Sequence, residues 1–226
     1  MTLDGSINEI FKRLDEWAGF PKYALERRLD IFLTPFLVEF FETRPGAHGD
    51  VTLVAPEFPI LSEIQKLVGD GGRPAAQLSG VDARTVNVDY LLHRAGRDAA
   101  WLFVELKTDS NSIDDHQMER YQAARKVGMR DLCRHIKELV QERTGKDFRP
   151  KYQRVLDAVA RSGSTDDPIE IVYLAPVQPR DAVPASAWNP GSDKGRFHSL
   201  QEFSEMTPRH HRELWGYVQP RLAGLK

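Results

Sequence analysis

Apolar and polar residues alternate in two neighbouring segments near the middle of the chain. In residues 84–92 the two alternating sets are Val86, Val88, Tyr90 and Leu92, and Thr85, Asn87, Asp89 and Leu91. Successive side chains of a strand point to opposite faces, so the pattern predicts a strand with Asp89 among polar neighbours. Residues 101–106 form a second strand-like run, and turn-forming residues separate the two. The sequence therefore predicts a β-hairpin.

Helical spacing of apolar residues predicts the elements on either side of this hairpin. Helices are expected at residues 6–17 and 21–41, and a long helix after the hairpin is expected to end near Arg143. Further helices are expected at 152–159 and 207–215, and apolar runs at 51–56 and 169–175 predict two more strands. The order around the hairpin is helix, strand, strand, strand, helix, strand.

This order predicts an α/β fold with a central mixed sheet flanked by helices. The chain has 226 residues, of which 41% are hydrophobic, which is enough for one sizeable core. We therefore expect a single domain over residues 1–226, with a C-terminal helical extension at about 198–224. Residues 176–197 are rich in Pro, Gly and Ser and are expected to form a long loop.

Composition excludes several classes of protein. The single cysteine, Cys133, excludes an intrachain disulfide framework, and the chain contains no HExxH, GxSxG or GxGxxG motif. The start lacks a basic-then-apolar signal segment, and the longest apolar run, residues 31–41, is too short to span a bilayer. A soluble cytoplasmic protein without a membrane partner is expected.

Charge is distributed unevenly along the chain. The formal net charge is −2, but residues 116–154 contain 11 Lys and Arg against 5 Asp and Glu, so this segment is +6 and the remainder is −8. A basic segment that begins on the helix after the hairpin suits a phosphate backbone. A solvated helix face with i,i+4 ion pairs explains the same composition equally well.

An ion pair is expected inside the second strand of the hairpin. Glu105 and Lys107 are two residues apart and share one face, while Leu102, Val104 and Leu106 occupy the other. A bare buried charge costs several kcal/mol unless it is paired or binds a metal ion. With Asp89 on the neighbouring strand, the carboxylates could ligate Mg²⁺ beside a lysine that holds water. A structural Glu–Lys pair at a strand end is the alternative.

The helix that follows the hairpin adds two polar residues to this set. Gln117 and Tyr121 are i and i+4, so they lie on one face of the helix, and Ala124 and Gly128 continue that face. Small residues allow the helix to approach the sheet closely, which would leave the Gln amide and the Tyr hydroxyl near Lys107. The alternative is an amphipathic helix with Tyr121 at the core edge and Gln117 in solvent.

The motifs V-D89-Y, V-E105-L-K107-T-D and Q117-M-E-R-Y121 resemble the PD-(D/E)xK nuclease superfamily, in its RecB-like variant with a QxxxY helix. Val88 stands where many members have a proline. The resemblance implies a restriction-endonuclease-like αβββαβ core and a nuclease that hydrolyses phosphodiester bonds, with DNA as the expected partner. It also implies Mg²⁺, or Mn²⁺ in its place, bound by Asp89 and Glu105. Lys107 would activate water, and Gln117 and Tyr121 would contact the site or the nucleic acid.

The resemblance leaves several features open. Members often supply a further acid from the first helix, and Glu26 is the first candidate and Glu39 the second, although a glutamate paired with a nearby arginine is an equal explanation for Glu26. Glu57 is either another site group or a buried hydrogen-bonded carboxylate. Many relatives act as homodimers. The rival interpretation is a catalytically silent nuclease-fold module that binds nucleic acid or a protein partner.

Overall fold

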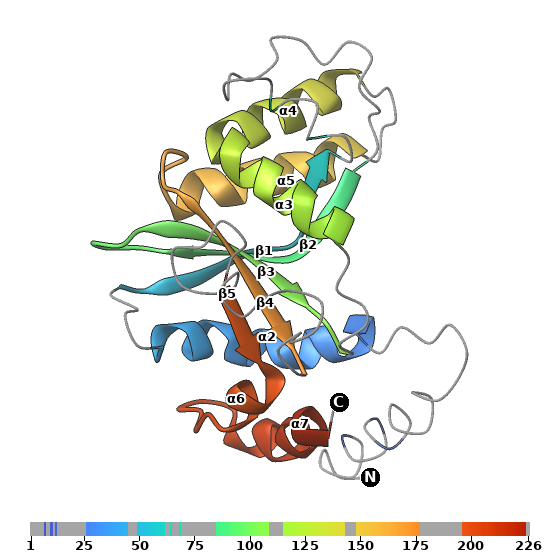
Figure 1. Cartoon of the computed structure of the whole chain (residues 1–226), viewed down its shortest axis with the longest axis vertical. Coiled ribbons are helices and arrows are strands. Elements are labelled where there is room, and N and C mark those ends of the chain that lie inside the picture. Colours follow the sequence, from blue (N-terminus) through green and yellow to red (C-terminus); the bar gives the residue numbers. More distant parts are fainter. Residues whose placement is uncertain are drawn as a thin grey trace.

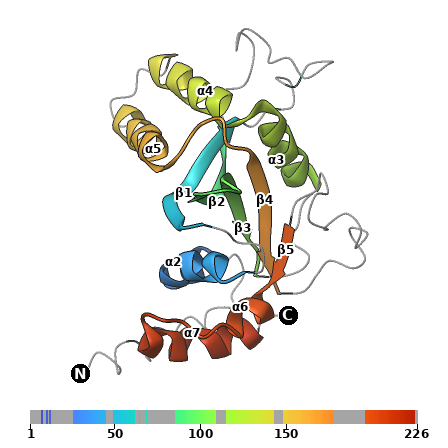
Figure 2. The same ribbon diagram turned by 90° about the vertical axis from the view of Figure 1, so that its left-hand side faces the viewer.

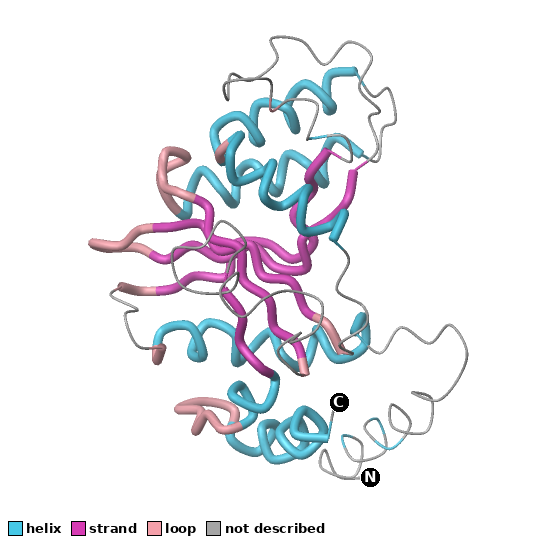
Figure 3. The backbone as a smooth tube through the Cα atoms, viewed as in Figure 1, coloured by secondary structure: helices cyan, strands magenta, loops and turns pink. Residues whose placement is uncertain are grey.

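A five-stranded mixed sheet lies at the centre of the computed structural model, which describes residues 7, 10, 12, 26–44, 49–61, 64, 68, 85–108, 115–142, 148–176 and 196–224 (Figures 1 and 3). The strands, in their order across the sheet, are β1 (Val51–Leu61), β2 (Thr85–Arg94), β3 (Ala100–Leu106), β4 (Ile169–Ala175) and β5 (Arg196–Ser199). β1, β2 and β3 pair antiparallel, whereas β3, β4 and β5 pair parallel. The expected α/β fold with a mixed sheet is confirmed.

Helices cover both faces of the sheet, as Figure 2 shows. They are α2 (Glu26–Glu42), α3 (Asp115–Val127), α4 (Met129–Glu142), α5 (Phe148–Ser162), α6 (Leu200–Ser204) and α7 (Arg212–Gly224). One hydrophobic cluster joins the sheet to α3, α4 and α5, and a second joins it to α2, α6 and α7. The predicted order of helix, three strands, helix and strand is found in α2, β1, β2, β3, α3 and β4.

β3 follows the alternation expected from its sequence. Trp101 and Phe103 pack in the cluster beneath α3, α4 and α5, while Leu102, Val104 and Leu106 pack in the cluster on the α2 side. Every residue of β3 is buried, because a strand in the middle of a sheet covered on both faces has no solvent side. Glu105 therefore projects from β3 toward α3.

The alternation expected for β2 is wrong beyond Val88. Val88 packs on the α3 side with Leu91, whereas Tyr90 and Leu92 pack on the α2 side. The side-chain faces therefore reverse at Asp89. On β1, Glu57 falls in the gap between the pairs Pro56–Tyr90 and Phe58–Val88, and it has a positive φ of 49°. Both strands thus depart from regular geometry at the same level.

Several other expectations need correction. The long helix expected to end near Arg143 is interrupted at Gly128, whose φ of 83° separates α3 from α4. β5 was not expected, and it pairs with β4 directly before α6. The last helix starts at Arg212 rather than near Thr207, and the helix expected at 6–17 and the loop expected at 176–197 lie largely outside the described residues. Within the described ranges, no helix has both the length and the apolar character needed to cross a bilayer.

Candidate functional site

A cleft of about 430 Å³ opens where β1, β2 and β3 meet α2 and the start of α3. The ionisable residues in its lining are Asp30, Glu57, Asp89, Glu105 and Lys107, so the lining has a formal charge of −3. Like charges that share a cleft repel one another, and a bound cation would relieve that repulsion. The cleft is therefore suited to a positively charged ligand.

Glu105 accepts hydrogen bonds from three side chains, and its own side chain is only 4% exposed. Its Oε1 accepts hydrogen bonds from Lys107 Nζ at 2.8 Å and from Gln117 Nε2 at 2.7 Å. Its Oε2 accepts a hydrogen bond from the Tyr121 hydroxyl at 2.5 Å. A buried carboxylate requires such partners to offset its desolvation. The structure thus brings together four of the five residues singled out in the sequence.

The Tyr121 hydroxyl acts as a neutral donor in this group. Burial, followed by the negative charge of Glu105, raises the pKa of Tyr121 far above that of a free phenol. Tyr121 also lies 2.9 Å from Gln117 Nε2, as expected for residues one helical turn apart. α3 therefore holds two donors toward Glu105 at fixed positions, because Ala123 and Ala124 on the same helix are buried in the core.

Asp89, the fifth residue, lines the same cleft but contacts the backbone of β3. Its Oδ2 accepts a hydrogen bond from the Leu106 N–H at 2.7 Å. The regular pairing of β2 with β3 extends only as far as Tyr90 and Val104. The Leu106 N–H thus donates to the Asp89 side chain. If the β2–β3 pairing continued, this N–H would instead donate to a backbone carbonyl of β2. The two strands separate at this end, and the cleft lies at the separation.

α2 contributes Asp30 to the cleft, a residue that the sequence did not single out. The Asp30 carbonyl accepts a hydrogen bond from the Tyr90 hydroxyl at 2.9 Å, which links this end of α2 to β2. Asp30 is four residues after Glu26 and therefore lies on the same face of the helix. The choice of Glu26 as a candidate could thus have pointed to Asp30 as well. Glu26 begins α2, but its side chain lies outside the described residues.

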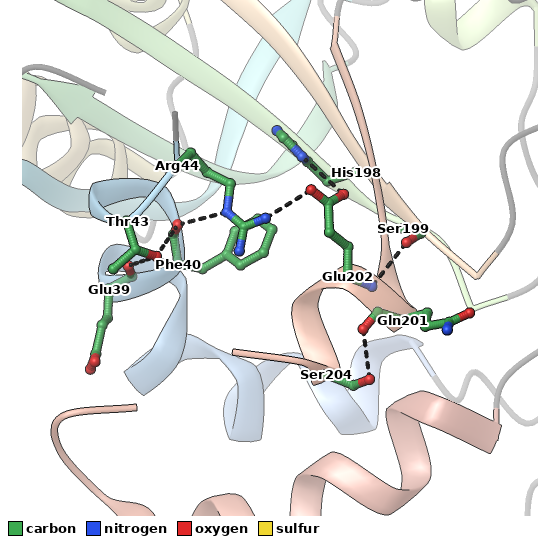
Figure 4. Close-up of polar contacts among 9 residues, drawn as sticks. All are labelled: Glu39, Phe40, Thr43, Arg44, His198, Ser199, Gln201, Glu202 and Ser204. Atoms are coloured by element: carbon green, nitrogen blue, oxygen red, sulfur yellow. Dashed lines mark hydrogen bonds and ion pairs between the residues drawn. The ribbon is translucent and has the colours of Figure 1, made fainter. Parts of the chain in front are cut away.

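Glu39, the second candidate on α2, does not line the cleft. Its buried carboxylate binds the Arg209 backbone N–H, and Arg209 Nε lies 3.3 Å from its Oε1. Arg209 also pairs with Glu42 at 2.5 Å. Figure 4 shows the Glu39 carboxylate pointing away from the nearby Arg44–Glu202 pair. Glu57, in contrast, does line the cleft.

The oxygen donors of the cleft match the ligands that Mg²⁺ and Mn²⁺ prefer. A carboxylate offers about four lone-pair positions, and three of those on Glu105 are already occupied by hydrogen bonds. In the part of the chain that the structure describes, no three His, Cys, Asp or Glu side chains are grouped closely enough to hold an ion. The oxygen donors are therefore of the kind that a hard divalent cation prefers. To bind one, the carboxylates of the cleft would have to move closer to one another.

Comparisons with known proteins identify no family for this chain: no family model, curated protein or solved structure matches it. A function for this chain therefore has to be inferred from the residues of the cleft and from the motifs that they form in the sequence.

Proposed function

We propose that this chain is a metal-dependent nuclease of the PD-(D/E)xK type that hydrolyses phosphodiester bonds in DNA. The observation that carries the proposal is the contact of Lys107, Gln117 and Tyr121 with Glu105 in a cleft that Asp89 also lines. These residues come from β2, β3 and α3, in the order that the motifs imply. The strand and helix order of the core supports a restriction-endonuclease-like arrangement.

Each residue has a separate role in this proposal. Asp89 and Glu105, with Asp30 from α2, would hold Mg²⁺, or Mn²⁺ in its place. The bound cation would supply positive charge to the phosphate and lower the pKa of water. Lys107 Nζ would donate a hydrogen bond to the attacking water or to a phosphate oxygen. Gln117 and Tyr121 position Glu105 through their hydrogen bonds to its two oxygens.

A silent nuclease-fold module that only binds nucleic acid is the second candidate, and one observation favours it. Both oxygens of Glu105 already accept hydrogen bonds, and one of them binds Lys107. The Lys107 ammonium group therefore occupies a lone-pair position of Glu105 that a metal ion could otherwise use. In this arrangement the Glu105 charge is already balanced by a buried ion pair, without a metal ion. Metal binding therefore distinguishes the two candidates.

The test combines Mn²⁺ binding with DNA hydrolysis. We expect the parent protein to bind Mn²⁺, measured by calorimetry, and to degrade at least one of linear, nicked or single-stranded DNA with Mg²⁺ present. Asp89→Asn should weaken Mn²⁺ binding at least tenfold, whereas Glu213→Gln, an exposed change on α7, should leave it unchanged. A parent protein that binds DNA but neither binds Mn²⁺ nor cuts would support the silent module instead.

A further inference from the structure

The exposed face of α5 carries a concentrated positive charge. α5 contains Arg149, Lys151, Arg154 and Arg161 against a single acid, Asp157. All four cations are exposed. Lys151, Arg154 and Arg161 are spaced by three and seven residues, which places them along one side of the helix. Ten residues of helix extend over about 15 Å, so this row spans several phosphates of a nucleic-acid strand.

Among the described residues, the α5 cations have no ionic partner, as is also true of Lys137 on α4, whereas the two exposed arginines of α4 are paired. Among the residues that the structure describes, no ion pair involves Lys151, Arg154 or Arg161, and Asp157 instead accepts a hydrogen bond from Gln153 at 2.7 Å. On α4, each exposed arginine is paired. Arg130 binds Asp166, and Arg134 binds Asp131 at 3.2 Å and Glu138 at 3.8 Å. A face stabilised by i,i+3 and i,i+4 ion pairs would resemble the two arginines of α4.

The remaining exposed residues of α5 indicate what kind of partner this face fits. Apart from Asp157, they are Pro150, Gln153 and Ala160, so the described side chains of this face include no large apolar one. A protein interface normally has an apolar or aromatic centre, and a helix that lies on a membrane needs an apolar side. A row of unpaired cations without apolar residues suits a polyanion whose charge is regularly spaced. A nucleic-acid backbone has this property.

We propose that the α5 row, defined as Lys151, Arg154 and Arg161, binds the sugar-phosphate backbone of double-stranded nucleic acid outside the cleft. The inference rests on the proposed function for the identity of the polyanion. α5 packs on the sheet through Leu156 and Val159, in the same hydrophobic cluster as Phe58 of β1. The preceding residue of β1, Glu57, lines the cleft, so the helix that carries the row packs against a strand that borders the cleft. The row contributes affinity without base specificity, because it contacts phosphates alone.

The test measures duplex binding without divalent cations, so that no hydrolysis takes place. A labelled 30-base-pair duplex is titrated with protein over a series of salt concentrations, and fluorescence anisotropy gives the binding constant. Lys151→Gln/Arg154→Gln should reduce the salt slope of the logarithm of the binding constant by about 1.8, because each lost phosphate contact contributes about 0.9. The matched control, Arg130→Gln/Arg134→Gln, removes the same charge from α4 and should change the slope much less.

Equal slopes for the two double variants would overturn the inference, because net charge alone would then explain the binding. So would a parent protein that binds vesicles of anionic phospholipid through the α5 row but binds no duplex. The outcomes for the two proposals are separable. If the parent cuts DNA and the α5 variant keeps the parental salt slope, the nuclease proposal stands and the α5 proposal fails. If the parent does not cut DNA but the α5 variant has a smaller salt slope than the parent, only the α5 proposal stands.

Discussion

Two buried glutamates occupy opposite sides of the sheet, and each is held by a cation. Glu105 is 3% exposed and binds Lys107 on the α3 side, while Glu39 is 5% exposed and binds Arg209 on the α2 side. Burial and ion pairing are thus nearly the same for both residues. Neither property distinguishes a functional carboxylate from a structural one.

The difference lies in the charge around each glutamate. Glu105 shares a cleft with three further acids and one lysine, so negative charge is in excess there. In the group around Glu39, here termed the α2 brace (Glu39, Glu42, Arg44, Glu202 and Arg209), each of the three acids contacts one of the two arginines, and Glu39 also accepts the backbone N–H of Arg209. The formal charge of the brace is therefore −1, against −3 for the cleft. An excess of unneutralised carboxylates beside an open cleft is therefore the stronger indication of a site, and the following substitutions test this distinction.

Removal of the cation from each glutamate should give the largest contrast. We expect Lys107→Ala to reduce the single-turnover rate of DNA cleavage by about 10²- to 10³-fold, the range for loss of one hydrogen-bond donor that stabilises the transition state. Mn²⁺ binding should persist, because Lys107 competes with the ion for Glu105 Oε1. Arg209→Ala removes the corresponding cation from Glu39 and should leave the cleavage rate unchanged. Equal rates in Lys107→Ala and the parent would exclude the proposed role of Lys107.

The second largest effect should be on the stability of the α2 brace. Glu39→Leu removes the acceptor of the Arg209 N–H and the partner of its guanidinium. Hydrogen bonds to charged groups contribute about 1.5–3 kcal/mol, and we expect a loss near 3 kcal/mol in the free energy of unfolding, measured with urea. Glu213→Leu, an exposed change on α7, should stay within about 0.5 kcal/mol. A cleavage rate that fell with Glu39→Leu in folded protein would contradict the separation of the two regions.

A smaller effect is expected from two tyrosines that donate to different acceptors. Tyr121 donates to the carboxylate of Glu105, whereas Tyr90 donates to the backbone carbonyl of Asp30. Tyr121→Phe should lower the free energy of unfolding by about 1.5 kcal/mol and Tyr90→Phe by about 1 kcal/mol, because the charged acceptor forms the stronger bond. Tyr121→Phe should also slow cleavage, though less than Lys107→Ala. A larger loss of stability in Tyr90→Phe would reverse the expected order.

The sequence was sufficient where a local period determines geometry. Glu105 and Lys107 share a face because side chains alternate along a strand, and Gln117 and Tyr121 meet because they are one helical turn apart. Both relations depend on neighbours within a few residues. They survive in the fold because β3 is covered by helices on both faces and α3 packs against it.

The sequence was insufficient where geometry depends on distant residues. The reversal at Asp89 accompanies a hydrogen bond to Leu106, 17 residues away, which no local pattern encodes. Asp30 reaches the cleft through the angle of α2 against the sheet, which is set by tertiary packing. The four residues of β5 have no periodic pattern of their own, and they form a strand because β4 offers a free edge.

The smallest expected effect concerns pH and originates in His198, which contacts Glu202 of the α2 brace. Burial lowers the pKa of His198 from its usual value of 6.5, with Glu202 raising the pKa and Arg44 lowering it. The folded protein therefore binds fewer protons at this site than the unfolded chain, so stability should fall as the pH decreases below about 6.5. His198→Gln should flatten the decline in melting temperature between about pH 7 and pH 5, whereas His210→Gln, on the surface, should keep the parental curve. Parallel curves for His198→Gln and the parent would assign the acid sensitivity to groups other than His198.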